Sequence, residues 1–92
     1  IADYTKAIEL DDINPTYYDN RALSKTEKEN YAGADEDYTF SIELYPSDPE
    51  TYYQRGLVKL MMNNNYDGCL DLKHAEELGA LEARAAIKNK CK

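Results

Sequence analysis

The stretch DPETYYQRGLVK, residues 48–59, decides how this chain folds, because a close copy of it occurs earlier as NPTYYDNRALSK, residues 14–25. Each copy starts with a side chain that can cap a helix and with a proline that suits the first helical position. Each copy then carries two adjacent tyrosines, followed by an arginine, a small residue, a leucine and a lysine. Such a recurrence predicts a structural unit that the chain uses more than once.

The two copies are related by a constant offset of 34 residues, which holds along the whole chain. The matching pairs are Pro15 with Pro49, Tyr18 with Tyr52, Arg21 with Arg55, Leu23 with Leu57, Lys25 with Lys59, Asp37 with Asp71, and Leu44 with Leu78. The offset also extends backward, because DYT at 3–5 and IEL at 8–10 recur at 37–39 and 42–44. Three successive copies, the first incomplete, therefore keep one register without a gap.

Each copy is predicted to form two helices. The first helices are expected over 15–28 and 49–62, and the second over 31–44 and 66–78, with Pro46 and Gly79 ending the second helices. Small residues at matching positions predict helix pairs that approach closely, with a large side chain filling the remaining gap. These residues are Ala22, Ala34, Tyr38 and Ser41 in one copy and Gly56, Gly68, Leu72 and Ala75 in the next. One hairpin cannot bury its apolar face alone, so we expect an all-α solenoid of stacked antiparallel helix hairpins.

This pattern resembles the tetratricopeptide repeat family over residues 1–82. The residues that carry the resemblance are Tyr18, Ala22, Ala34, Tyr38, Ser41 and Pro46, followed by Tyr52, Gly56, Gly68, Leu72 and Ala75. The resemblance implies a right-handed superhelix in which the first helix of each hairpin lines a concave groove for a partner. The chain departs from the family pattern at Lys25 and Lys59, where an aromatic residue is common, and at Ala80, which replaces a proline.

Four segments are predicted. Residues 1–14 are the second helix of a truncated repeat, 15–48 and 49–79 are repeats, and 80–92 form a capping helix that lays Ala83, Ile87 and Cys91 on the last repeat. The chain starts inside a helical pattern without methionine, so we interpret it as part of a longer protein. An apolar stripe along residues 1–8 predicts self-association through the N-terminal helix.

Composition limits the class of partner. The net charge is −7, and there is no basic stripe, so neither nucleic acid nor an anionic membrane is expected to bind. Apolar residues make up 42% of the chain, but no run approaches the ~18 apolar residues that span a bilayer. The two cysteines, Cys69 and Cys91, show neither a disulfide framework nor a zinc-site spacing, and we interpret them as reduced thiols.

No group of residues predicts catalysis, a cofactor or a metal. The single histidine, His74, is expected to face solvent. The acidic run DEDY at 35–38 lies in a predicted helix, whereas calcium loops need tight turns with alternating oxygen ligands. Six acidic residues recur with the repeat and are interpreted as a solvated helix face. They are Asp3, Glu9, Asp37, Glu43, Asp71 and Glu77.

The groove is predicted from helical spacing along the first helix of each hairpin. The candidate residues are Asn20, Leu23, Glu27, Tyr53, Gln54, Leu57 and Met61. The amides can bond to a peptide backbone, and methionine adapts to varied apolar side chains. Tyr18 and Tyr52 are instead expected to wedge helices together. In the alternative interpretation, Leu23 and Leu57 only pack between neighbouring first helices.

Binding is therefore the expected function, with a partner peptide or helix held in the concave groove. The alternative is a structural or oligomerisation module that binds no separate ligand. Some members of the resembled family hold a terminal carboxylate with lysine, arginine and asparagine on successive first helices. Asn20 matches one of these positions, but Glu50 and Gln54 stand where lysine and arginine would be needed. We therefore do not expect this chain to clamp a terminal carboxylate.

Overall fold

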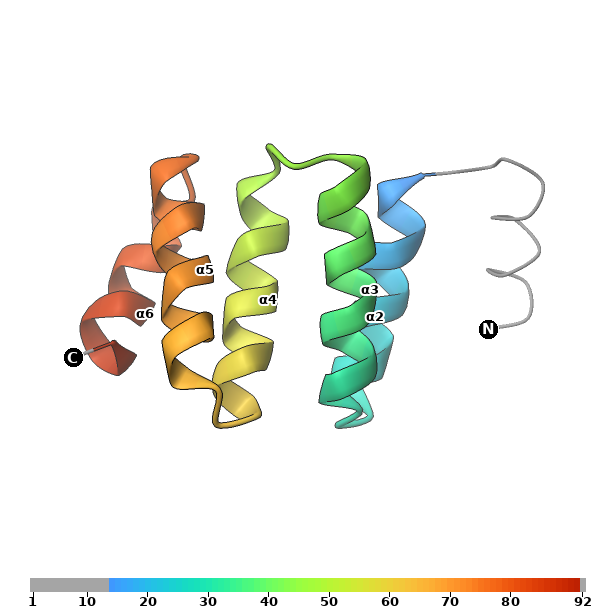
Figure 1. Ribbon diagram of the computed structural model, residues 1–92, viewed down its shortest axis with the longest axis horizontal. Helices are drawn as coiled ribbons and strands as arrows, with labels where there is room; N and C mark the ends of the chain where they lie inside the picture. The colour runs from blue at the N-terminus through green and yellow to red at the C-terminus, as the bar shows by residue number, and fades with distance from the viewer. Residues whose placement is uncertain (1–13, 92) are drawn as a thin grey trace.

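The computed structural model describes residues 14–91, which form helices α2 to α6 and contain no strand. The helices are α2 (Pro15–Glu27), α3 (Tyr31–Leu44), α4 (Pro49–Met61), α5 (Asn65–Glu77) and α6 (Glu82–Lys90). They stack in chain order, and the extensive contacts are between consecutive helices (Figure 1). The predicted all-α solenoid of helix hairpins is confirmed. The predictions for the N-terminal helix over residues 1–14, including self-association, concern residues that lie largely outside the described part of the chain.

The helix boundaries follow the predicted caps and repeat themselves in both hairpins. The Asn14 carboxamide oxygen accepts a hydrogen bond from the Thr16 backbone N–H at 2.9 Å, and the Asp48 carboxylate accepts one from the Glu50 N–H at 3.0 Å. Within each hairpin, the turn contains one residue with a left-handed backbone. Both of these residues, Glu29 and Asn63, have φ of 63°, and they lie one repeat apart. The repeat therefore extends to individual backbone conformations.

The small residues lie where the two helices of a hairpin touch, as predicted. Ala22 and Ala34 are fully buried and cluster with Tyr38 and Val58. In the second hairpin, glycines take the two alanine positions. A Cβ atom added to Gly56 would lie 2.9 Å from the Gly68 carbonyl oxygen and 3.0 Å from Leu72 Cγ. The backbones of α4 and α5 thus pack against each other with no room for a side chain.

Gly56→Val is expected to lower the free energy of unfolding by about 1–3 kcal/mol, because overpacking a tight contact forces the two backbones apart. Urea unfolding followed by circular dichroism at 222 nm measures the change. Gly33→Ala is the control, because the three atoms nearest to its new Cβ belong to the side chains of Asn30 and Lys25 rather than to a backbone. A Gly56→Val protein as stable as the Gly33→Ala protein would contradict the close contact.

Two of the recurring acidic residues correct a sequence prediction. Asp37 and Asp71 are buried rather than part of a solvated face. Arg21 Nη2 lies 2.8 Å from Asp37 Oδ1, Arg21 Nε donates to Oδ2 at 3.0 Å, and Lys25 Nζ lies 3.1 Å from Oδ2. The aspartate thus recurs at the offset of 34 residues together with the arginine and the lysine that pair with it.

The second hairpin repeats this arrangement. Arg55 Nε donates to Asp71 Oδ2 at 2.7 Å, and Lys59 Nζ lies 3.7 Å from the same oxygen. Lys25 and Lys59 thus occupy the two positions where the resembled family often has an aromatic residue, and each pairs with the buried acid. Glu43 and Glu77, by contrast, are exposed as predicted. Each hairpin therefore encloses one carboxylate between an arginine and a lysine.

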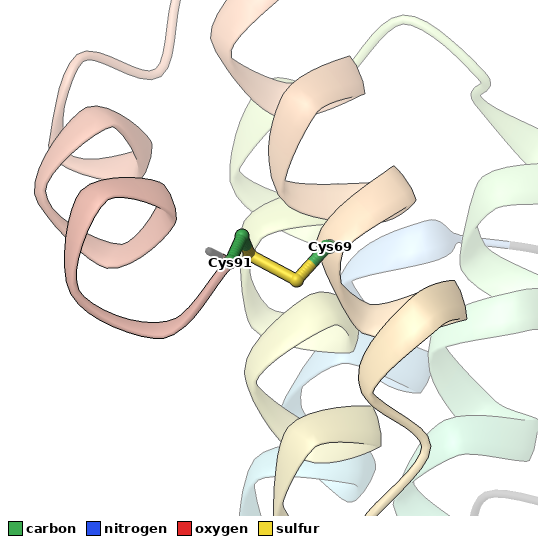
Figure 2. Close-up of a disulfide and its surroundings, with 2 residues drawn as sticks. All are labelled: Cys69 and Cys91. Carbon is green, nitrogen blue, oxygen red and sulfur yellow. A yellow bond between two sulfur atoms is a disulfide. The ribbon is translucent and has the colours of Figure 1, made fainter.

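The cysteines correct a second prediction, because Cys69 and Cys91 form a disulfide (Figure 2). Cys69 lies in α5 and Cys91 directly follows α6, with a sequence separation of 22 residues and Cα atoms 5.7 Å apart. The two residues meet because the loop at Gly79 turns α6 back onto α5. The spacing of the two cysteines in the sequence does not reveal that α6 folds back onto α5. The prediction of reduced thiols was therefore wrong.

The predicted helix after Gly79 is present as α6. Its Ala83 is fully buried in a cluster with Ala75 and Ala80. Tyr52 and Tyr53 of α4 pack against the same cluster, so α6 covers the open side of the second hairpin. The division into segments 15–48, 49–79 and 80–92 stays a prediction.

Candidate peptide-binding groove

A cavity of about 170 Å³ lies between the first helices of the two hairpins. Its walls come from α2, α3 and α4, and the lining residues are Asp19, Asn20, Leu23, Tyr38, Glu50, Thr51 and Gln54. Three of the predicted groove residues, Asn20, Leu23 and Gln54, are therefore brought together. Leu23 is 49% exposed, so packing between the helices leaves much of this residue uncovered.

The other predicted groove residues lie elsewhere along the first helices. Glu27 and Met61 are exposed near the ends of α2 and α4, and Leu57 is half-buried. Tyr53 packs against the alanine cluster beneath α6. None of these four lines the cavity. The role of the whole predicted set in binding stays a prediction.

The cavity is acidic. Asp19 and Glu50 line it, and Asp48 lies close enough to act on Asp19 electrostatically. Burial, together with the negative charges of Asp48 and Glu50, raises the pKa of Asp19 above its usual value, although the hydroxyls of Ser41 and Thr51 oppose this shift. No lysine or arginine is among the lining residues.

Tyr38 forms the floor of this cavity and was predicted only as a packing residue. It is 3% exposed, but its hydroxyl oxygen is not a fully buried atom without a hydrogen-bond partner, which within residues 14–91 is true only of Asp35 Oδ1. Burial raises the pKa of Tyr38 to about 12, and the negative charges of Asp19 and Glu50 add to the shift. A neutral hydroxyl therefore lies beside the two carboxylates. The signal that could have revealed it is the hairpin itself, because α3 backs the space between α2 and α4.

Asp19→Asn is expected to leave the protein at least as stable as the wild type at pH 7. Since the pKa of Asp19 is raised on folding, the folded state binds its proton more tightly than the unfolded state does. The stabilisation from this proton is fully present below the unfolded value of 3.8 and is lost as pH rises through the folded pKa. The advantage of the variant should therefore shrink as pH falls toward 4.

Urea unfolding at pH 4, 5, 6 and 7 measures this difference. Glu43→Gln is the matched control, because it removes one exposed negative charge from α3 outside the cavity. A variant that is less stable than the wild type at pH 7, by more than the control, would show that the Asp19 charge stabilises the fold.

Tyr18 and Tyr52 each pack against a ring of the following helix, as predicted for residues that hold the helices together. Tyr18 lies against Phe40 of α3 with ring centroids 5.4 Å apart, and Tyr52 lies against His74 of α5 at 4.3 Å. The His74 side chain is 49% exposed, so one side of the expected solvent-facing histidine is covered by a tyrosine ring. Between residues 14 and 91 there is no group of three or more potential metal ligands. None of the described helices is long and apolar enough to cross a membrane.

Comparisons with known proteins match the fold and the repeat. The TPR domain of Arabidopsis OM64 is 30% identical in a solved structure with a TM-score of 0.84, and the match covers 94% of this chain and 73% of that one. The first TPR of Spaghetti (RPAP3), solved with the HSP90 peptide SRMEEVD, is 24% identical with a TM-score of 0.85, covering 96% of this chain and 71% of that one. This second likeness supports the fold alone.

Two curated proteins match by sequence. The E3 ubiquitin-protein ligase CHIP of Arabidopsis thaliana is 32% identical over 76 residues, which are 83% of this chain and 27% of that protein. Serine/threonine-protein phosphatase T of Aspergillus oryzae is 34% identical over 70 residues, 76% of this chain and 15% of that protein. The chain thus spans about a quarter or less of these relatives. No protein-family model matches the chain.

Stacked hairpins with a constant period, close contacts between small residues and a cavity between successive first helices define a helical-repeat protein of the solenoid class. Within that class, the chain belongs to the tetratricopeptide repeat family. The fold of this family serves as a protein-interaction scaffold.

Proposed function

We propose that the chain binds an extended or helical segment of a partner protein in the groove between α2 and α4. The observation that carries the proposal is the cavity itself, which lies between successive first helices and contains Asn20, Leu23 and Gln54. The negative net charge of −7 disfavours nucleic acid, which leaves protein as the matching partner class. The proposed role involves no catalytic step.

The cavity combines the two features that a peptide site needs. Leu23 offers an exposed apolar surface inside a concave wall, and covering it would remove apolar area from water. The carboxamides of Asn20 and Gln54 can donate to a backbone carbonyl and accept from a backbone N–H. Gln54 already donates to the Glu50 carboxylate at 2.8 Å, which orients its amide group. Glu27, Leu57 and Met61 extend the proposed surface along the same two helices.

The peptide-bound neighbour shows that a protein with this fold can hold a peptide, but it does not identify the ligand of this chain. The first TPR of Spaghetti (RPAP3) was solved with the acidic HSP90 peptide SRMEEVD. In this chain the cavity carries Glu50 and Gln54 on α4, where a carboxylate ligand would require cations. An acidic segment would therefore meet negative charge. The proposal is limited to peptide binding and does not extend to the HSP90 peptide.

Selection of a random dodecapeptide library on the immobilised chain tests the proposal. Fluorescence anisotropy then compares a selected peptide on the wild type, on Leu23→Ala and on the matched control Leu70→Ala. Leu70 is exposed to 48%, which is close to the 49% of Leu23, but it lies on α5 and does not line the cavity. If Leu23 is a binding hot spot, Leu23→Ala should weaken binding by about 2 kcal/mol, or about thirtyfold.

Circular dichroism should show that both variants keep the helical fold. Equal affinity of the two variants would place binding outside the groove and contradict the proposal. If selection yields no peptide and sedimentation shows concentration-dependent association, the structural or oligomerisation module would replace it.

A further inference from the structure

We propose that the partner segment places a lysine or arginine side chain in the cavity, between Asp19 and Glu50. This inference rests on the proposed function for the location of the binding site, and it adds the chemistry of the ligand. The relevant observations are a group of carboxylates without a cation, the hydroxyl of a largely buried tyrosine beside them, and the shape of the cavity.

The carboxylates around the cavity differ from the two buried aspartates in having no cation. Asp37 and Asp71 are each paired with an arginine and a lysine. Among the described residues, no ion pair reaches Asp19, Asp48 or Glu50. The cations nearest in the repeat, on α2 and α4, are held by the two buried aspartates. The field around Asp19 and Glu50 is therefore negative and open to an external cation.

Partial burial makes this charge more effective. Asp19 is half-buried, and the loss of solvation that raises its pKa also reduces the screening of its charge. A cation entering the cavity would relieve the mutual repulsion of Asp19, Asp48 and Glu50. An ammonium or guanidinium group would form charge-assisted hydrogen bonds with these carboxylates, which are stronger than bonds between neutral groups.

Tyr38 supplies an independent sign that the cavity is built for a polar group. Tyr38 is 3% exposed, and no hydrogen bond within residues 14–91 reaches its hydroxyl oxygen, which is the part of the side chain that is not fully enclosed. Tyr38 lines the cavity, so its hydroxyl oxygen can accept a hydrogen bond from an ammonium or guanidinium N–H that enters between the carboxylates.

The size and the apolar wall of the cavity fit one long basic side chain. Its volume of about 170 Å³ is below the ~300–1,000 Å³ of pockets for drug-sized ligands, and it suits the end of a single side chain. Leu23 lies at the exposed edge of the cavity and can cover a methylene stem. Lysine and arginine combine such a stem with a charged head, as the cavity requires.

Three matched peptides test the inference: Ac-AALXLAA-NH2 with lysine, norleucine or glutamate at X. Titration of the 15N-labelled chain, followed by NMR, measures which backbone amides shift and the affinity of each peptide. We expect the lysine peptide to shift the amides of the cavity residues and to bind at least fivefold more tightly than the norleucine peptide. The glutamate peptide should bind most weakly. Added NaCl should reduce the preference, because salt screens exposed charges.

The double variant Asp19→Asn/Glu50→Gln should abolish the preference for lysine over norleucine. The matched control Glu43→Gln/Glu77→Gln makes the same change in net charge at two exposed residues outside the cavity and should keep the preference. Shifts at the cavity with equal affinities, or with glutamate preferred, would overturn the inference but leave the proposed function standing. No shift at the cavity with the lysine peptide would overturn the inference. The library selection decides the proposed function separately.

Discussion

Replacing Asp37 by alanine is expected to lower the free energy of unfolding by about 3–5 kcal/mol, the largest effect among the substitutions considered. Asp37 has a fully buried side chain, and its two oxygens bind Arg21 and Lys25. Removing one member of a buried ion pair leaves the partner charge desolvated and uncompensated, which costs more than the intact pair contributes. Urea unfolding, followed by circular dichroism, measures the loss.

Three further variants show whether the unpaired charge is the cause. Asp71→Ala should be less severe, because the Asp71 side chain is 9% exposed while that of Asp37 is 0% exposed. Glu43→Ala, at an exposed position of α3, should change stability by no more than about 0.5 kcal/mol. The triple variant Arg21→Met/Lys25→Met/Asp37→Leu should recover most of the loss, because it replaces all three charged side chains by apolar groups. If Asp37→Ala cost no more than Glu43→Ala, the ion pair would be irrelevant to stability.

Reducing the disulfide between Cys69 and Cys91 is expected to lower the free energy of unfolding by about 3 kcal/mol. The bond closes a loop with a sequence separation of 22 residues, and a cross-link of this span restricts the unfolded chain. It also ties α6 to α5, where Ala83 is buried against Ala75 and Ala80. Urea unfolding with and without tris(carboxyethyl)phosphine measures the difference.

Cys91→Ser is the matched control, because without the bond the reductant has nothing to act on. Its stability should equal that of the reduced wild type and should not respond to the reductant. Two free thiols in the untreated protein, titrated with a thiol reagent, would contradict the disulfide. So would unfolding curves that coincide with and without reductant.

The fold was predictable because its determinants are local and periodic. Asn14 and Asp48, each followed by proline, mark the first helices, and small residues at a constant offset mark their contacts. Each helix packs mainly on its neighbours in the sequence. A solenoid therefore does not depend on contacts between elements far apart in the sequence, which would be hard to predict. Helices α2 to α5 begin and end within one residue of the predicted positions.

The lining of the cavity was predictable only in part. Helical spacing identified Asn20, Leu23 and Gln54, because all three project from the first helices. It did not separate them from Tyr53, which the same spacing assigned to the groove and which the structure places against the cluster beneath α6. The surroundings of Tyr53 depend on where α6 packs, and the helical spacing along α4 does not predict the position of α6.

The sequence by itself determined the repeat, its helices, its caps and the contact positions of its small residues, because each of these depends on residues near in sequence or one period apart. Only the tertiary structure decided the environment of each charge and thiol. Asp37 and Asp71 recur like Glu43 and Glu77, yet the first pair is buried beside cations and the second pair faces solvent. Cys69 and Cys91 bond because α6 turns back onto α5. The period of the sequence shows which residues repeat. The burial of each acidic side chain and the pairing of the cysteines depend instead on which surfaces meet when the helices stack.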